Sequence, residues 1–323
     1  ASASDRMRDQ TGSTVPCAMR AELAVAGIPR LRSCTTRSAK IIPVAGKDDP
    51  YPESVKIMRV LLSPCPRLVA FVDGAVARLM IDNPARRNAI DLAMWTAIPP
   101  LMTALAADPA VRVIVLTSHE GPFSAGADIS EFDTTRATPE GSRAYEEENV
   151  RAFAAVADCP RPVIAAIRGH CFGAGSGLAL SCDLRVATED AQFAIPAARL
   201  GVAYPPAAFA PIVAAIGPAR TKELFFTGRR VTASEALALG LVTMVVPTDH
   251  LGPAVADLAA TIARGAPMTQ TATKRSVDAA AGLPFARGAD EVQAIADACF
   301  DSADFAEGRA AFRERREPEF TGR

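Results

Sequence analysis

The stretch 169–183 has the composition of a site built from backbone groups rather than from reactive side chains. It follows the apolar run 162–167, so the pattern predicts a buried strand, a tight turn and a helix that begins at about Ala174. Glycine costs up to about 1 kcal/mol relative to alanine inside a helix, yet it recurs here at alternate positions. These positions are Gly173, Gly175 and Gly177. A helix start that other groups can approach closely would suit a carbonyl oxygen that develops negative charge, or a phosphate.

Another loop, 124–128, has a similar organisation, because it also follows an apolar run (111–116) and consists mainly of small residues. Each of the two loops could present a backbone N–H group to the same oxygen atom. Two such donors form an oxyanion hole, and removal of one donor typically lowers the rate by about 10²–10³. The two loops together therefore predict a site that stabilises negative charge on an oxygen.

Other kinds of site fit these residues less well. Ser176 lacks an evident catalytic triad, and the stretch 174–178 breaks the G-x-S-x-G pattern of a nucleophilic serine. The chain has three histidines, of which His170 could act as a base, although its place in the turn favours a packed, hydrogen-bonded role. The glycine spacing also misses the G-x-G-x-x-G pattern of a dinucleotide site.

Composition limits the class of protein. The 323 residues are 49% hydrophobic, with a net charge of −1, which predicts a packed globular core and argues against nucleic-acid binding. The seven cysteines include no CxxC pair and no Cys/His cluster, so we expect reduced thiols, a cytoplasmic location and no metal site. No uncharged apolar run reaches 18 residues, so no membrane span is expected.

The first part of the chain, 1–66, lacks sustained periodicity and contains scattered Pro, Ser, Thr and Arg, which predicts a flexible extension. A targeting peptide is a sharper alternative, but acidic residues interrupt its expected composition. A natural start further along the chain, for instance at Met58, is a third possibility. The sequence alone does not choose among them.

Strand and helix patterns alternate from residue 68 to about 250, and the rest of the chain is predicted to be helical to its end. The expected class is therefore α/β. A two-residue Asp73-Gly74 turn between 68–72 and 75–81 predicts a hairpin. A helix is expected over 91–106 and a polar, acidic one over 141–157. Further strands are expected at 111–116, 162–167, 184–187, 192–195 and 241–246.

Several motifs, in order along the chain, resemble those of the crotonase, or enoyl-CoA hydratase/isomerase, family. The segment 81–91 resembles its Asn-Arg-Pro…Arg-Asn-Ala-Leu motif, and 123–129 resembles its Phe-x-Ala-Gly-Ala-Asp-[Ile/Leu] loop. The strand, glycine turn and helix of 163–183 are similar to those of the family, as are 224–246 and the final segment 300–320. The resemblance covers residues from about 67 to 323.

The resemblance implies a spiral of ββα units over 67–265 and a helical region over 266–323 that forms a homotrimer or a dimer of trimers. It also implies an acyl-CoA thioester as substrate, with no cofactor beyond its CoA moiety. The N–H groups of Ala127 and Ala174 would then hold the thioester oxygen.

Further residues are implied to contact CoA. Backbone groups near Ala125, Ala127, Arg86 and Arg87 would lie against it. By the same resemblance, its phosphates or adenine would be approached by Lys274, Arg316 and Phe320, in part across a subunit boundary. A solvated surface is an equally good interpretation of the charged residues.

The departures from the family pattern bear directly on the reaction. Hydratases of the family carry two glutamates, and the matching positions here are Gly177 and Ala197. Neither residue can transfer a proton, and acid–base catalysis contributes roughly 10²–10⁴ in rate. Hydration by that pair of residues is therefore not expected, and a one-base isomerase fails on the second position as well.

Tyr204 lies where related acyl-CoA decarboxylases have a similar tyrosine, although simple packing also explains an aromatic residue there. Arg199 could bind a substrate carboxylate, but pairing with an acidic surface residue is favoured. The sequence thus predicts an enzyme that stabilises a thioester enolate for decarboxylation, hydrolysis or another CoA-thioester conversion. The alternatives are a non-catalytic acyl-CoA-binding homologue and a hydratase with a displaced acid or base.

Overall fold

The computed structural model describes residues 40–42, 58–283 and 286–323. The flexible extension expected over 1–66 lies mostly outside the described residues. Two short strands within that range are nevertheless described, β1 (Lys40–Ile42) and β2 (Met58–Leu61), and β2 pairs with β3. The sheet therefore begins before residue 67, the boundary that the sequence predicts for the core.

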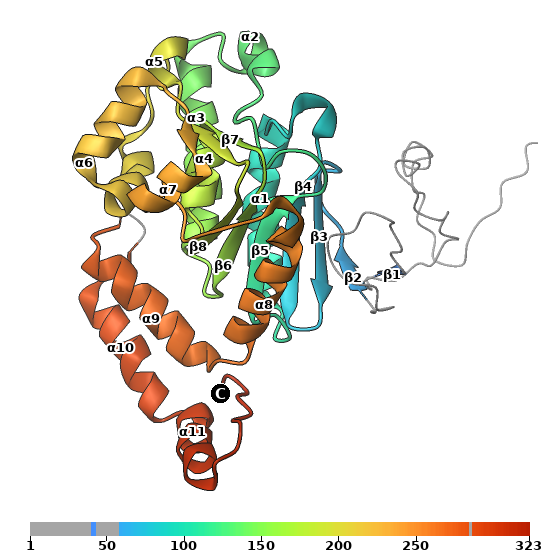
Figure 1. Cartoon of the computed structure of the whole chain (residues 1–323), viewed down its shortest axis with the longest axis vertical. Helices are drawn as coiled ribbons and strands as arrows, with labels where there is room; N and C mark the ends of the chain where they lie inside the picture. The colour runs from blue at the N-terminus through green and yellow to red at the C-terminus, as the bar shows by residue number, and fades with distance from the viewer. Residues whose placement is uncertain (1–39, 43–57, 284–285) are drawn as a thin grey trace, which may run out of the picture. The chain divides into compact units, whose positions relative to one another are not determined.

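The main sheet has eight strands in the order β1-β2-β3-β4-β5-β6-β8-β11 (Figure 1). Strands β3 (Leu68–Asp73) and β4 (Val76–Ile81) form the expected antiparallel hairpin. Its two turn residues are Gly74 and Ala75 rather than Asp73 and Gly74, because Asp73 pairs with Val76 and Gly74 takes the left-handed conformation (φ +58°). From β4 onward the strands are parallel: β5 (Val113–Ser118), β6 (Val163–Ile167), β8 (Leu184–Thr188) and β11 (Met244–Val246).

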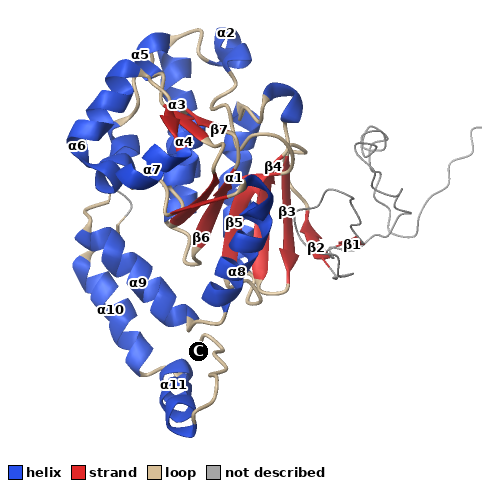
Figure 2. Cartoon of the chain, viewed as in Figure 1, coloured by secondary structure: helices blue, strands red, loops and turns tan. Residues whose placement is uncertain are grey.

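Both faces of β5 and β6 are buried along their whole length, which explains the mainly apolar sequences of these two strands. On β5, Ile114 and Leu116 join the larger hydrophobic cluster, whereas Val113 and Val115 join a smaller cluster on the other face. Helix α8 (Leu251–Ala263) covers the smaller cluster. On the larger side, helices α1 (Leu92–Ala107) and α3 (Pro139–Ala157) pack against each other (Figure 2).

Successive turns of the chain also add strands to a small second sheet, in the order β10-β9-β7. Its strands are β7 (His170–Phe172), β9 (Gln192–Ala194) and β10 (Val231–Thr232). Strands β6 and β7 precede helix α4, and β8 and β9 precede α5, which confirms the expected ββα spiral.

The other helices of this part of the chain are α2 (Phe132–Thr135), α4 (Ala174–Leu180), α5 (Ala197–Leu200), α6 (Phe209–Thr227) and α7 (Ala233–Leu239). Short 3-10 helices span Pro84–Arg86 (η2), Ile129–Glu131 (η3), Pro206–Ala208 (η4) and Thr248–His250 (η5).

Local sequence signals set several boundaries. Asp91 caps α1 by accepting a hydrogen bond from Met94 N, so the helix predicted over 91–106 begins one residue later. The last predicted strand is shorter than expected, because Leu241 N donates to Ala236 O and so belongs to the end of α7.

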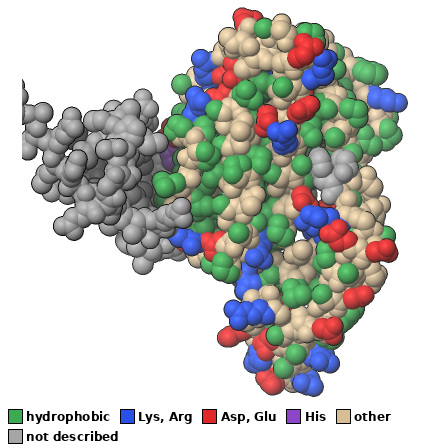
Figure 3. Space-filling view, turned by 180° about the vertical axis from the view of Figure 1, so that it is seen from behind, with side chains coloured by type: hydrophobic (Ala, Val, Ile, Leu, Met, Phe, Trp, Pro, Cys, Tyr) green, Lys and Arg blue, Asp and Glu red, His purple; other side chains and the backbone are tan. Residues whose placement is uncertain are grey.

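Three helices form the C-terminal region: α9 (Pro267–Ala280), α10 (Ala289–Phe300) and α11 (Ala303–Glu314). The prediction of helix to the chain end is wrong after Glu314, because Arg315 takes the left-handed conformation and ends α11. Side chains of both charge signs gather at the end of the molecule that α11 forms (Figure 3). Arg316 there pairs with Glu307 and Glu314.

Candidate functional site

The two loops singled out by the sequence meet beyond the carboxyl ends of β5 and β6. Ser124 and Cys171 form an isolated parallel bridge, in which Phe172 N donates to Ser124 O (3.0 Å). Gly126 (φ +101°) lies so close to the next turn that an added Cβ would be 2.9 Å from Phe172 O and 3.5 Å from Ala174 N. Glycine is needed at this position because both the backbone angle and the close approach exclude a side chain.

Buried polar side chains hold in place the loop 124–128, which comes first along the chain and is called the first loop below. Asn88 is fully buried and left-handed (φ +56°), and its Nδ2 donates to the carbonyl oxygens of Glu120 (2.7 Å) and Pro122 (2.6 Å). Its own carbonyl oxygen accepts from Ser124 Oγ (2.8 Å), and that Oγ accepts from Gly126 N (3.1 Å). These hydrogen bonds fix the backbone of the loop, and the side chains that make them have a structural role.

The N–H groups on either side of Ala127 and the one directly before Ala174 are occupied. Asp128 N donates to Ile90 O (2.9 Å), and Gly173 N donates to Ala194 O (2.8 Å). Ala174 is the first residue of α4, so its N–H has no partner inside the helix. Among the hydrogen bonds of the described residues, none uses the N–H of Ala127 or of Ala174. Both groups can therefore bind an oxygen from outside the chain.

Helix α4 has glycine where neighbouring side chains leave no space. A Cβ on Gly175 would lie 2.8 Å from Ser124 Cβ, so this glycine allows α4 to approach the first loop. A Cβ on Gly177 would lie 2.8 Å from Phe153 Cζ, a ring that α3 supplies. The space in which a side chain at 177 would begin is thus filled by phenylalanine. Ala197, at the start of α5, is buried and carries no ionisable group.

Tyr204 lies beside this region. Its hydroxyl oxygen would be 3.5 Å from a Cβ on Gly173, the residue directly before Ala174. Its ring packs edge-on against Phe225 and Phe209, which both belong to α6, so this helix holds the side chain in place. Within the described chain no hydrogen bond occupies the hydroxyl, which leaves it available to a ligand. The structure therefore brings Tyr204 together with Ala127 and Ala174.

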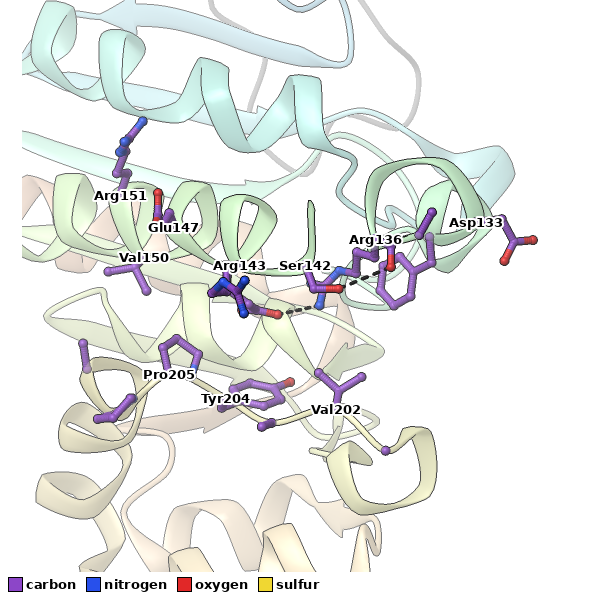
Figure 4. Close-up of a pocket in the computed structure, with 17 residues that line it drawn as sticks. Asp133, Arg136, Ser142, Arg143, Glu147, Val150, Arg151, Val202, Tyr204 and Pro205 are labelled. Carbon is purple, nitrogen blue, oxygen red and sulfur yellow. Dashed lines mark hydrogen bonds and ion pairs between the residues drawn. The ribbon is translucent and has the colours of Figure 1, made fainter. Parts of the chain in front are cut away.

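Tyr204 also lines a cleft of about 1180 Å³ between α3 and the loop that follows α5. Figure 4 shows Tyr204, Val202 and Pro205 on one wall, with Arg136, Ser142 and Arg143 facing them from the other. Burial, and then the negative charge of Glu146, raise the pKa of Tyr204 above its ordinary value. The phenol is therefore neutral at physiological pH and can donate a hydrogen bond.

Glu146 and Arg136 form an ion pair in this cleft, with Oε1 and Nη1 2.7 Å apart. Neither residue is among those that the sequence predicts for a catalytic role. Helical periodicity offered a signal for Glu146, because it is three and seven residues from Asn149 and Phe153, which are both buried. Arg136 follows α2 and carries no comparable signal.

Two acidic residues near the first loop have structural roles. Asp128 accepts from Ser130 N, and although burial raises its pKa, hydrogen bonds from Ser130 and the charge of Arg86 lower it overall. Glu131 accepts from Leu92 N at the start of α1 (2.8 Å), and burial raises its pKa. Both carboxylates cap helices.

Some of the residues expected to contact CoA lie next to the first loop. Ala125 N donates to Arg87 O (3.0 Å), which joins the turn 84–87 to the loop. The Arg86 side chain is 53% exposed and binds Asp128 Oδ1 (3.1 Å). Arg86, Arg87, Ala125 and Ala127 therefore form one continuous surface at the carboxyl end of the sheet.

Lys274 and Phe320 lie elsewhere. Lys274 is buried and pairs with Asp183 (2.9 Å), and the same carboxylate accepts from the N–H of Val163 at the start of β6. Phe320 O accepts from the side chain of Arg112, just before β5. Both residues are thus near the amino ends of the parallel strands, on the order of 15 Å from the carboxyl ends of these strands. Within one chain the structure does not bring them to Ala127 and Ala174.

The remaining candidates have other partners. Ser176 is buried and donates to Cys171 O (2.6 Å), and His170 stacks on Phe172 (4.7 Å between ring centres). Arg199 donates to Thr227 O rather than to an acidic side chain, so the expected surface ion pair is wrong. In the part of the chain that the structure describes, no cluster of three or more metal-ligating side chains occurs, and no helix is long and apolar enough to span a membrane.

Comparisons with known proteins agree with this architecture. The family model described as enoyl-CoA hydratase/isomerase matches residues 72–323. A carnitinyl-CoA dehydratase from Proteus mirabilis is 33% identical over 258 residues, which are 77% of this chain and 96% of that protein. A solved structure from Hyphomonas neptunium, assigned to the same family, is 37% identical with a TM-score of 0.76 and covers 81% of this chain and 100% of its own. An enoyl-CoA hydratase/carnithine racemase from Magnetospirillum magneticum is 35% identical (TM-score 0.74), with 81% and 97% coverage.

Proposed function

The chain belongs to the enoyl-CoA hydratase/isomerase, or crotonase, family, and on that premise we propose that it converts an acyl-CoA thioester through an enolate. The N–H groups of Ala127 and Ala174 hold the thioester oxygen and stabilise the charge that develops on it. CoA lies along Arg86, Arg87 and Ala125, and no cofactor other than the CoA moiety of the substrate takes part.

The observation that carries this proposal is the contact between the two loops. The close approach of Gly126 to Ala174 N and the absence of partners for the two N–H groups are the conditions for two donors to reach one oxygen. Preorganised backbone donors of this kind need no reorganisation when charge develops during the reaction.

Among the reactions that an enolate allows, decarboxylation of a malonyl-type CoA ester fits this site better than hydration. Loss of CO₂ leaves the electron pair on the thioester, so no base is needed to form the enolate. Hydration needs proton transfer by side chains, and Gly177 and Ala197 supply none. Tyr204, which is neutral and faces Gly173, can orient the departing carboxylate with a hydrogen bond.

The proposed assembly is a homotrimer or a dimer of trimers. The C-terminal helices expose Phe300 (66%) and Phe312 (86%), and α6 exposes Phe226 (75%). Exposed aromatic side chains at this density suit a contact between subunits. In such an assembly, Lys274 and Phe320 would reach CoA only from a neighbouring subunit, because within one chain they lie near the opposite ends of the parallel strands.

The direct test compares turnover of methylmalonyl-CoA and crotonyl-CoA by the wild-type protein and by Tyr204→Phe. The proposal predicts CO₂ release from the first ester, a decrease of about 10² in kcat in Tyr204→Phe, and little hydration of the second. The matched control is Phe209→Leu, which changes an aromatic neighbour of Tyr204 but keeps the hydroxyl.

Two outcomes would contradict the proposal in different ways. Efficient hydration of crotonyl-CoA that survives Tyr204→Phe would favour a hydratase with a displaced acid or base. Tight binding of both esters without turnover would favour a non-catalytic acyl-CoA-binding protein. Isothermal titration calorimetry with the two esters separates the second outcome from a failure to bind.

A further inference from the structure

Three carboxylates line the cleft, and they differ in their exposure to solvent. Asp133 and Glu147 are exposed, and Asp133 lies at the outer end of the cleft in Figure 4. The Glu146 side chain is only 21% exposed. Among the acidic residues that line this cleft, Glu146 is therefore the one that a bound acyl group would shield from water.

The carboxylate of Glu146 is held from two sides. Its Oε1 pairs with Arg136 Nη1 (2.7 Å), and its Oε2 accepts a longer hydrogen bond from Asn149 Nδ2 (3.3 Å). Arg136 is itself fixed, because its guanidinium lies over the rings of Phe132 (4.4 Å) and Tyr145 (4.1 Å) and its side chain is only 10% exposed. A surface ion pair would not need this support, so the arrangement is that of a preorganised group.

Glu146 shares the cleft with Tyr204, whose hydroxyl lies next to Gly173 and hence next to the proposed oxygen site. The charge of Glu146 is one of the causes of the raised pKa of Tyr204, which agrees with their placement in one cleft. An acyl chain that enters from the oxygen site would run between α3 and Tyr204, along the wall that carries Glu146.

Building on the proposed enolate, we propose that Glu146 is the group that exchanges a proton with the α-carbon of the bound acyl-CoA. It acts on the α-carbon alone, from a helix other than those of Gly177 and Ala197, and the second proton-transferring group that hydration needs is still missing at those two positions. In decarboxylation the same group would act in the opposite direction, because the enolate left by CO₂ loss must receive one proton at the α-carbon.

The proton transfer balances without an additional reactant. The α-carbon–hydrogen bond breaks, its proton goes to Glu146 Oε2, and its electron pair remains on the substrate as the enolate held by Ala127 and Ala174. In the reverse direction the O–H bond of the carboxylic acid breaks and the α-carbon–hydrogen bond forms. In D₂O the carboxylic acid exchanges with solvent, so a deuteron is returned.

Deuterium exchange at the α-carbon of butyryl-CoA, followed by proton NMR, tests this proposal. Butyryl-CoA has no double bond to hydrate and no carboxylate to lose, so exchange reports proton transfer alone. We expect Glu146→Gln to lower the exchange rate by about 10²–10⁴, with the Kd for butyryl-CoA changed by less than about threefold. The matched control is Glu140→Gln, which changes an exposed carboxylate of the same helix that does not line the cleft and should leave the rate unchanged.

Glu146→Asp covers the case in which the glutamine variant does not fold. It keeps the charge opposite Arg136 but moves the carboxylate by one methylene, so the rate should fall while the melting temperature is retained. Exchange in Glu146→Gln within about fivefold of wild type would overturn the role of Glu146 and leave the enolate proposal intact. Absence of exchange in the wild type, with butyryl-CoA bound, would also overturn the role of Glu146, whereas absence of CO₂ release from bound methylmalonyl-CoA would overturn the proposed function.

Discussion

The ring of Phe153 occupies the space in which a side chain at Gly177 of α4 would begin. An added Cβ at 177 would lie 2.8 Å from Phe153 Cζ and 3.1 Å from Cε2. Phe153 is buried and packs edge-on against Trp95, so its ring cannot move freely. A side chain at 177 is therefore excluded by a ring that fills its place.

This packing predicts the effect of introducing a glutamate there. Gly177→Glu should destabilise the fold by about 1–3 kcal/mol, because the new side chain overpacks against Phe153. Gly177→Glu combined with Phe153→Ala should recover part of that loss, since truncation of the ring removes the steric clash. Urea denaturation of the three variants, including Phe153→Ala alone, measures the coupling. If the loss of stability in the double variant equals the sum of the losses in the two single variants, the account is contradicted.

Tyr204 makes a second prediction at the scale of single residues. Burial and the charge of Glu146 raise its pKa, so the folded state favours the neutral phenol and Tyr204 should remain protonated through pH 10. The absorbance at 295 nm of wild type and Tyr204→Phe should therefore coincide up to that pH. A titration step near pH 10 that is present in the wild type and missing from the variant would contradict this environment.

At the scale of elements, the site depends on how the first loop is tied to the turn before α1. Asn88 provides this link with hydrogen bonds to Asn83 N, Glu120 O and Pro122 O. Its left-handed backbone suits asparagine or glycine. The sheet supplies the position of the loop, and Asn88 supplies its conformation.

Asn88→Gly isolates the contribution of this side chain, because glycine keeps the left-handed backbone. We expect a loss of about 2–3 kcal/mol in the free energy of unfolding, from buried backbone groups left without partners. Thermal or urea denaturation measures it, with Gly121→Ala as a comparison that strains the same loop through its backbone (φ +69°). A loss below about 0.5 kcal/mol would show that the loop does not depend on Asn88.

Much at this scale could be predicted from the sequence, because the signals are local. The helix predicted over 91–106, the strand predicted over 162–167 and the helix predicted to begin at about Ala174 all have the correct element type. The contacts of Glu146, Arg136 and Phe153 could not be predicted, since they depend on how α3 packs against elements distant in the sequence. The contacts of Lys274 with Asp183 and of Phe320 with Arg112 could not be predicted for the same reason.

At the scale of the whole molecule, the exposed phenylalanines near the C-terminal helices predict self-association. Light scattering after size-exclusion chromatography should give three or six times the chain mass of 33.8 kDa. Phe312→Ser should lower that mass, because Phe312 is 86% exposed in the single chain. Leu62→Ser is the matched control, since Leu62 is 92% exposed but precedes β3, outside the C-terminal helices. A wild-type monomer would contradict the proposed assembly.

The measurement that tests the central claim most directly removes one of the two N–H donors without removing a side chain that does chemistry. Ala174→Pro deletes the N–H at the first position of α4, where proline fits a helix, whereas Ala174→Gly retains it. If Ala127 and Ala174 hold the thioester oxygen, deuterium exchange into butyryl-CoA should fall by about 10²–10³ in the proline variant and by less than about threefold in the glycine variant. Equal exchange rates in two folded variants would contradict the account.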